Sequence, residues 1–133
     1  MNIVANFNAT VQSAKASSGS PTIMAYLNVT TIKIKSGIDN ATMNVTNPAN
    51  NAVFTSGPKT ITGTLSDPSN VVTTVAICVQ KVTGGGADCA NAAKGGTVSR
   101  NYNFAGPAQY MVWIQVSDGT STNTSSKVTY NVT

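Results

Sequence analysis

The chain has 133 residues, long enough to bury roughly two-thirds of its unfolded surface, and only 9% of them are charged, against roughly 25% in an ordinary soluble protein. It contains no His and no Glu, and eight basic and four acidic residues give a net charge of +4. This inventory argues against an enzyme, because nucleophiles and general acid–base steps mostly depend on His or on paired carboxylates. The basic residues are scattered, which argues against nucleic-acid binding.

Polarity comes instead from Asn, Thr, Ser and Gly, which rank low in helix propensity and suit short strands and turns. The composition therefore predicts an all-β protein without a cofactor. No stretch approaches the roughly eighteen apolar residues of a membrane span, and residues 1–6 lack the basic and apolar regions of a secretory signal. If Met1 is the natural start, the chain is made without export. If Met1 was added for expression, the chain is a mature fragment of something secreted.

The first 42 residues are predicted to form an N-terminal β arm that serves assembly. Residues 13–21 form a small-residue linker in this prediction, and residues 22–35 form a second extended run. An alternating strand on a linker can complete its own sheet or that of a neighbour, which is the basis of strand addition and domain swapping. Residues 2–12 alternate in this way, and one face of the predicted assembly strand carries Ile3, Ala5, Phe7, Ala9 and Val11.

Residues 43–133 are predicted to form an immunoglobulin-like β-sandwich, because turn residues separate short β-prone segments. Residues 84–96, which are rich in Gly, are predicted to be a flexible excursion. Within residues 110–116, the side chains of Tyr110, Val112, Ile114 and Val116 share one face, which we expect to be core. The predicted strands are an opening strand followed by a Pro/Asn turn within residues 44–53, and then residues 59–65, 71–82, 97–104, 110–116 and 127–132.

The strings VTNPANNAVFTSGPKTITGTLSDPSNVVTTVAICV and YNFAGPAQYMVWIQVSDGTSTNTSSKVTYNV carry a family resemblance. A Pro-Ala-Asn turn, a T-x-x-G-T-x-S-D-P segment, a Y-x-V-x-V-x-V-x-D strand and a final V-x-Y-x-V strand resemble bacterial and viral immunoglobulin-like (Big/PKD-type) repeats. The resemblance covers about residues 43–133 and implies the fold. Such repeats occur in adhesins, secreted enzymes, surface layers and phage virions, so the resemblance does not single out a function.

Asp67 and Asp118 are the residues that a two-carboxylate glycosidase site or a calcium site would use. Both begin turns, Asp-Pro and Asp-Gly, in which an Asp side chain caps its own backbone. A calcium ion also requires roughly six to eight oxygens, with several carboxylates among them. We therefore predict two turn residues, with no catalytic site and no metal site.

Cys78 and Cys89 are the only cysteines. If the chain reverses near Thr83, the two residues face each other across a hairpin, and a disulfide there would contribute about 2–3 kcal/mol. Two reduced thiols are the alternative, which a cytosolic setting would favour. Both possibilities are open from the sequence, and the spacing carries no metal signature.

Met111, Trp113 and Gln115 lie on the face of their strand opposite Tyr110 and Val112. If the face with Tyr110 and Val112 is core, the face with Trp113 points outward, and an exposed Trp–Met pair is a candidate interface. In the alternative, the N-terminal segment folds back and covers this face.

Six N-x-[ST] sequons resemble those of a surface glycoprotein, although a chain so rich in Asn, Ser and Thr contains several by chance. They are at Asn8, Asn28, Asn40, Asn44, Asn123 and Asn131.

The leading functional hypothesis is a decoration or cement protein on the surface of a tailed-phage capsid. It would bind the major capsid protein or copies of itself through residues 1–42, form part of a large assembly, and touch host-surface glycans weakly. The rival is a glycosylated extracellular filament or surface-layer subunit, with residues 2–12 as a pilus-like donor strand. A third possibility is a carbohydrate-binding or adhesion module that binds through Trp113 or Tyr102.

Overall fold

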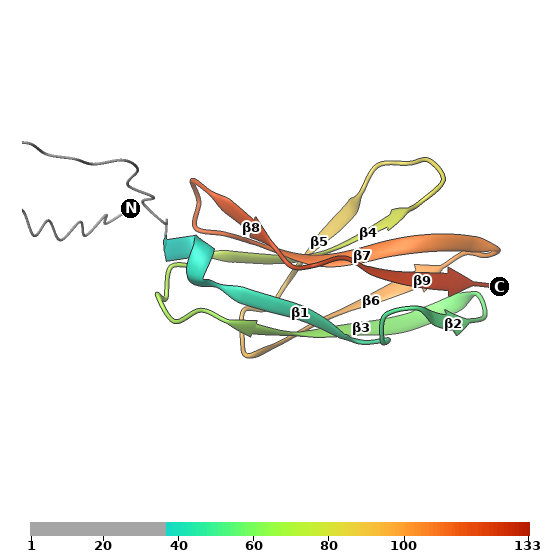
Figure 1. Ribbon diagram of the computed structural model, residues 1–133, viewed down its shortest axis with the longest axis horizontal. Coiled ribbons are helices and arrows are strands. Elements are labelled where there is room, and N and C mark those ends of the chain that lie inside the picture. The colour runs from blue at the N-terminus through green and yellow to red at the C-terminus, as the bar shows by residue number, and fades with distance from the viewer. Residues whose placement is uncertain (1–36) are drawn as a thin grey trace, which may run out of the picture. The chain divides into compact units, whose positions relative to one another are not determined.

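The computed structural model describes residues 37–133, which form two β-sheets packed face to face (Figure 1). The all-β sandwich predicted from the sequence is confirmed. The predicted assembly strand with Ile3, Ala5, Phe7, Ala9 and Val11 lies outside the described residues. A short 3-10 helix, η1 (Gly37–Asn40), is followed by β1 (Thr42–Asn47), β2 (Ala52–Phe54), β3 (Gly57–Ser66), β4 (Thr74–Lys81), β5 (Asp88–Ala92), β6 (Thr97–Phe104), β7 (Ala108–Ser117), β8 (Thr122–Thr124) and β9 (Val128–Val132).

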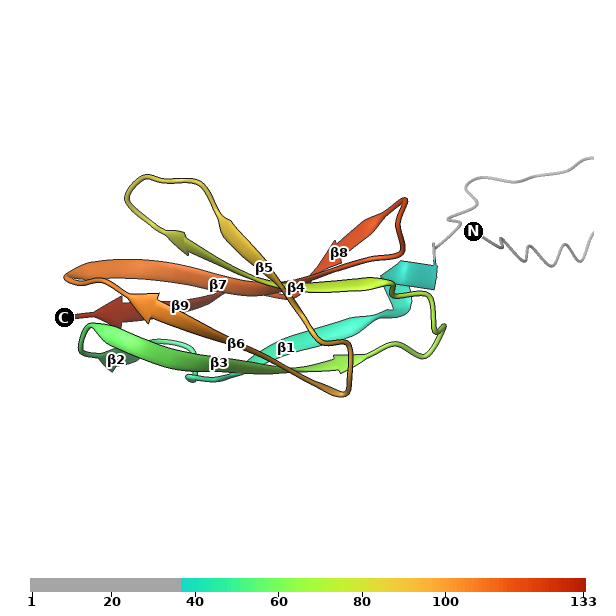
Figure 2. The same cartoon turned by 180° about the vertical axis from the view of Figure 1, so that it is seen from behind.

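The strands are distributed between the sheets as in an immunoglobulin-like sandwich. The smaller sheet has the order β1-β3-β6, and the larger has the order β2-β9-β7-β4-β5, with β8 paired to β7. The chain changes sheet after β1, β2, β3, β5 and β6, so most neighbours within a sheet are distant in sequence, as in a Greek key. In the view from behind, β4, β5 and β7 lie above β3 and β6 (Figure 2).

The two ends of the sandwich are distinct. One, called here the N-terminal end, holds η1 and the loops after β3 and β7. The other, the C-terminal end, holds Thr133 and the loops after β2 and β6 (Figure 1). Gly37 and Thr133 therefore lie at opposite ends of the described unit.

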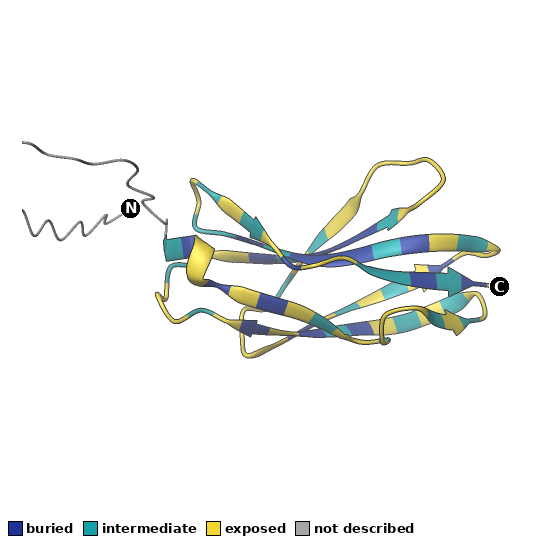
Figure 3. Ribbon diagram, viewed as in Figure 1, coloured by how far each residue is buried: buried dark blue, intermediate teal, exposed yellow. Residues whose placement is uncertain are grey.

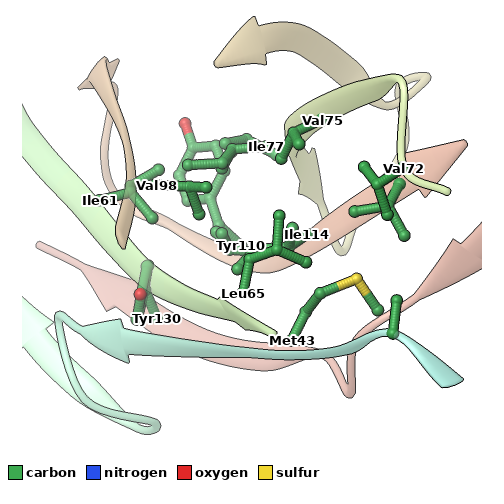
Figure 4. Packing of buried hydrophobic residues seen from close by; sticks show 14 of the residues in the cluster. Met43, Ile61, Leu65, Val72, Val75, Ile77, Val98, Tyr110, Ile114 and Tyr130 are labelled. Carbon is green, nitrogen blue, oxygen red and sulfur yellow. The ribbon is translucent and has the colours of Figure 1, made fainter. Parts of the chain in front are cut away.

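The core lies between the sheets, and Figure 3 shows buried residues, in dark blue, along strands of both sheets. Period-two alternation predicts this pattern, because successive side chains of a strand point to opposite faces. The predicted core face of β7 is confirmed, since Tyr110, Val112, Ile114 and Val116 are each at most 1% exposed. Figure 4 shows Ile61 and Val98 of the smaller sheet facing Ile77, Tyr110 and Ile114 of the larger one.

Two buried tyrosines tie connections to the core. The Tyr110 hydroxyl donates to the carbonyl oxygen of Ala105 at 2.7 Å and accepts from its N–H at 3.2 Å. A Tyr at the start of a strand that bonds backbone a few residues upstream is the tyrosine corner of immunoglobulin-like sandwiches. The Tyr130 hydroxyl donates to the carbonyl of Pro48 at 2.8 Å, which fixes the crossing from β1 to β2. Burial raises the pKa of Tyr130, so the hydroxyl stays a donor.

The packed core includes described residues that precede the sequence resemblance, which begins near Met43. Ile38 and Ala41 are 0% and 4% exposed and belong to the core. The amide of Asn123 donates to the carbonyls of both residues at 3.1 Å, so β8 holds η1 against the sandwich.

Part of the predicted flexible excursion is ordered as a strand. Residues 88–92 form β5 and pair antiparallel with β4, so only the tip of the hairpin is loop. Asp, Ala and Asn have low β-propensity, which is why the sequence did not indicate this strand. Residues 71–73, which the sequence placed in a strand, form a loop instead.

Gly63 occupies the Gly position of the T-x-x-G-T segment, and the structure supplies a reason for a residue without a side chain. A Cβ at this position would lie 2.4 Å from Cδ1 of Ile114 and 2.5 Å from the carbonyl oxygen of Asn44. The first atom belongs to the fully buried core, and the second belongs to the backbone of the neighbouring strand, so neither yields easily.

We expect Gly63→Ala to destabilise the protein by about 1–3 kcal/mol, the usual cost of overpacking a core. Gly95→Ala is the matched control, because the nearest atom to its Cβ would be 3.5 Å away, an ordinary contact. Urea denaturation of both variants measures the difference in the free energy of unfolding. Equal stability of the two variants would contradict the close approach at Gly63.

Candidate functional site

The sequence left open whether Trp113 is an exposed interface residue or is covered by the N-terminal segment. It is not exposed, and the N-terminal segment lies outside the described residues. Trp113 lies on the outer face of β7, opposite the core, yet it is only 7% exposed. Its cross-strand neighbour on β4 is Cys78, and Nζ of Lys127 lies 4.5 Å from the centre of its ring. Met111 and Gln115, on either side of it along the same face, are half-buried. Among the described residues, the exposed large apolar side chains are instead Val53 and Val82.

Cys78 and Cys89 form a disulfide between β4 and β5. The two residues lie directly opposite in the antiparallel register, and their Cα atoms are 4.0 Å apart. Cys78 is fully buried beside Trp113, whereas Cys89 is exposed on the edge strand. In both overall views the end of the β4–β5 hairpin rises away from the sandwich, and the disulfide joins its two strands (Figures 1 and 2).

Arg100 joins the two sheets, a role that the sequence did not reveal. From β6 of the smaller sheet, its Nη1 donates to the carbonyls of Ile77 and Asp88 in the larger sheet, both at 2.7 Å. Its Nη2 lies 2.9 Å from the carboxylate of Asp88. The side chain is 12% exposed and both of its terminal nitrogens have partners, so Arg100 serves structure.

Asp67 caps the loop between β3 and β4, as the turn prediction required. Its carboxylate accepts hydrogen bonds from the N–H groups of Val71 at 3.2 Å and Val72 at 3.0 Å, and Nζ of Lys94 lies 3.1 Å away. Burial alone would raise the pKa of Asp67. The N–H of Val72, the Lys94 ammonium and the N–H of Val71 outweigh that cost and hold the pKa below its usual range.

Because the pKa of Asp67 is lowered in the folded protein, its contribution to stability should change with pH in a defined direction. The stabilising contribution of Asp67 is fully present above the unfolded pKa of about 3.9 and is lost as the pH falls through the lower folded pKa. We expect Asp67→Asn to cost about 1–3 kcal/mol at pH 7, because an amide oxygen carries no charge and cannot satisfy both N–H groups as well. The difference in the free energy of unfolding between this variant and the unsubstituted protein should shrink below about pH 4. Urea denaturation across this range measures it.

Asp118→Asn is the exposed comparator for that measurement. The Asp118 carboxylate accepts from the N–H of Ser121 at 2.7 Å and from the N–H of Thr120 at 2.9 Å, and these bonds lower its pKa. Because solvent screens this carboxylate, we expect a smaller effect than at Asp67. Two results would contradict the role of the Asp67 carboxylate as the stabilising cap. One is a larger loss of stability in Asp118→Asn than in Asp67→Asn, and the other is a loss in Asp67→Asn that does not depend on pH.

These hydrogen bonds account for both aspartates as turn residues. Among residues 37–133, no group of three or more His, Cys, Asp or Glu side chains is placed to hold a metal ion. A small hollow of about 220 Å³ lies beside Asp67 at the N-terminal end and is lined by Leu65, Asp67, Asn70, Lys94, Gly95 and Gly96. In the same part of the chain, no helix has the length and hydropathy needed to cross a membrane.

The C-terminal end of the core is an aromatic cluster, with ring centres separated by 4.7–6.3 Å in neighbouring pairs. Three cations lie over its rings. Lys59 Nζ is 5.5 Å from the centre of the Phe54 ring, the Arg100 guanidinium is 5.0 Å from that of Tyr102, and Lys81 Nζ is 5.8 Å from that of Tyr110. The members of the cluster are Phe54, Tyr102, Phe104, Tyr110 and Tyr130.

The sequon asparagines differ in accessibility. Asn40 and Asn44 are exposed, and Asn44 points away from the core on β1. The Asn123 amide already donates to two backbone carbonyls, so a glycan on that nitrogen would disrupt the packing of η1. The remaining sequons are at Asn131, which is half-buried, and at Asn8 and Asn28, which lie outside the described residues.

Comparison with known proteins shows the fold and no family. No protein-family model and no curated protein matches the chain. Similar solved structures are an engineered protein, at 17% identity and a TM-score of 0.54, and the endo-β-1,4-mannanase from Thermotoga petrophila, at 10% identity and a TM-score of 0.56. The matches cover 72% and 71% of this chain but only 21% and 20% of those proteins, so the chain spans about a fifth of their length.

Proposed function

We propose that this protein is a non-enzymatic structural protein displayed on the capsid of a tailed phage, as a decoration protein. The observation that carries this proposal is that charged side chains which catalysis could use make structural contacts instead. Asp67 and Asp118 cap turns, and the ion pair of Asp88 and Arg100 bridges the two sheets. The surface that remains for function is dominated by Asn, Thr, Ser and Gly.

The opposite placement of the two ends supports attachment at one end and display of the other. The segment before Gly37 joins the sandwich at the N-terminal end, beside the loops after β3 and β7 (Figure 1). In this proposal that segment holds the protein to the major capsid protein or to other copies of the chain. The C-terminal end then faces solvent.

Purified virions of the source organism's phage test the proposal. We expect the full chain to co-sediment with intact capsids through a density gradient and to be present in many copies per particle by quantitative mass spectrometry. A gene carried by no virus, or capsids that lack the protein, would overturn the proposal.

A cell-surface or filament subunit is the second candidate, and the disulfide favours it. Disulfides persist in oxidising surroundings and are rare in the cytosol, so the Cys78–Cys89 bond fits a protein exposed outside the cell. The exposed sequons at Asn40 and Asn44 fit the same setting. Intact mass of the protein from its source separates the candidates: hexose-bearing species favour the cell surface, whereas an unmodified chain in purified capsids favours the virion.

A further inference from the structure

Two lysines at the C-terminal end have no acidic partner. Lys59 and Lys81 make no ion pair within residues 37–133, whereas Lys94 and Arg100 are paired with aspartates. Both lie over rings of the aromatic cluster, Lys59 over Phe54 and Lys81 over Tyr110. Because those rings belong to one packed group, the two ammonium groups lie at the same end of the sandwich.

The charges of the described unit are divided between its ends. Asp39 lies in η1, and Asp67 and Asp118 lie in the loops after β3 and β7, all at the N-terminal end (Figure 1). Near the aromatic cluster the carboxylate side chain is that of Asp88, and Arg100 neutralises it at 2.9 Å. The cluster therefore carries an excess of positive charge with little competition from acidic groups.

Tyr102 lies between the two lysines and has an unused hydroxyl. It is the direct cross-strand neighbour of Lys59, and its ring centre is 6.3 Å from that of Tyr110, over which Lys81 lies. The hydroxyls of Tyr110 and Tyr130 donate to backbone carbonyls, but that of Tyr102 has no partner within residues 37–133. No buried side-chain oxygen there lacks a partner, so this hydroxyl reaches solvent.

We propose that this end binds an acidic saccharide, with Lys59 and Lys81 contacting its carboxylate or sulfate and Tyr102 supplying a hydroxyl. Ammonium groups recognise anions through charge-assisted hydrogen bonds, and an aromatic edge with a hydroxyl suits a ring that has apolar C–H groups and polar substituents. The inference extends the proposed function, because a displayed C-terminal end is the part of the protein that meets surface glycans. Trp113, the other aromatic candidate for this role, is covered.

The test is titration calorimetry of the full chain with an oligosaccharide of uronic acids, a sulfated dextran and neutral dextran. We expect binding to one or both acidic probes and none to neutral dextran; the two acidic arms distinguish carboxylate from sulfate recognition. Lys59→Gln/Lys81→Gln should weaken binding about a hundredfold or more, because two charge-assisted hydrogen bonds are lost and each is worth roughly tenfold or more in affinity. Tyr102→Phe should weaken it about fivefold, with an unchanged circular dichroism spectrum.

Lys127→Gln is the matched control, because Lys127 also covers an aromatic ring and also lacks an acidic partner within residues 37–133, but it lies on the outer face at Trp113. It should keep affinity within about twofold. Absence of binding to both acidic probes would overturn the inference, as would equal losses in the Lys127 variant and the double variant. Neither result bears on the proposed function, which depends on whether the protein is part of the capsid.

Discussion

Trp113→Ala is expected to destabilise the protein by about 3–5 kcal/mol, the usual cost of truncating a buried aromatic side chain. The indole is 7% exposed, contacts the Lys127 ammonium and lies beside the buried Cys78, so its removal leaves a cavity on the outer face of the larger sheet. Because Trp113 is the only Trp, denaturation has to be followed by far-UV circular dichroism rather than by fluorescence.

Met111→Ala is the control for this prediction. Met111 lies on the same face of β7 but is only half-buried, so its truncation should cost about 1 kcal/mol. If Trp113 were an interface residue, the opposite pattern would appear: Trp113→Ala would weaken assembly and leave the free energy of unfolding nearly unchanged. That pattern would contradict the burial of the indole.

Removal of the disulfide is expected to cost about 3 kcal/mol. The bond joins residues 11 apart, and in the chain-entropy description a loop of that length gives about this gain through restriction of the unfolded chain. The variant Cys78→Ala/Cys89→Ala, compared with the oxidised protein by urea denaturation, measures the loss. The hairpin tip should show the largest gain in amide hydrogen exchange, because the disulfide holds β5 at the edge of the sheet.

Fluorescence provides an independent check on the same bond. Cys78 and Trp113 are direct cross-strand neighbours, whose Cβ atoms in such pairs are about 4.5–5.5 Å apart, and a disulfide at contact quenches indole emission. Reduction should therefore increase the emission of Trp113 in the native protein, and the same reductant should have no effect on the Cys-free variant. Stability unchanged by the double substitution, or emission that does not respond to reduction, would contradict this arrangement of Cys78 and Trp113.

The parts of the fold that depend on local chemistry could be predicted from the sequence. Alternation indicated the core face of β7, and turn chemistry indicated that Asp67 and Asp118 cap their own loops. The resemblance motifs also acquire physical reasons. The Gly of T-x-x-G-T is Gly63, where a side chain would meet the core, and the Tyr before the alternating strand is Tyr110, the tyrosine corner.

The parts that depend on contacts between distant segments could not be predicted. Alternation showed that Trp113 faces away from the core, but the residues that lie beside it come from β4 and the loop before β9. Likewise Arg100 looks like one more surface cation until its partners on β4 and β5 are known. β5 itself has weak strand propensity and is held by pairing and by the disulfide.

The central proposal is that the described domain is a disulfide-stabilised structural module that works outside the cell. The most direct measurement is alkylation of the protein recovered, without reduction, from purified particles or from the exterior of its source, and then intact mass spectrometry. We predict that neither Cys78 nor Cys89 is labelled unless a reductant is added first. Protein recovered from purified particles or from the exterior of its source with both cysteines labelled in the absence of reductant would contradict the proposal.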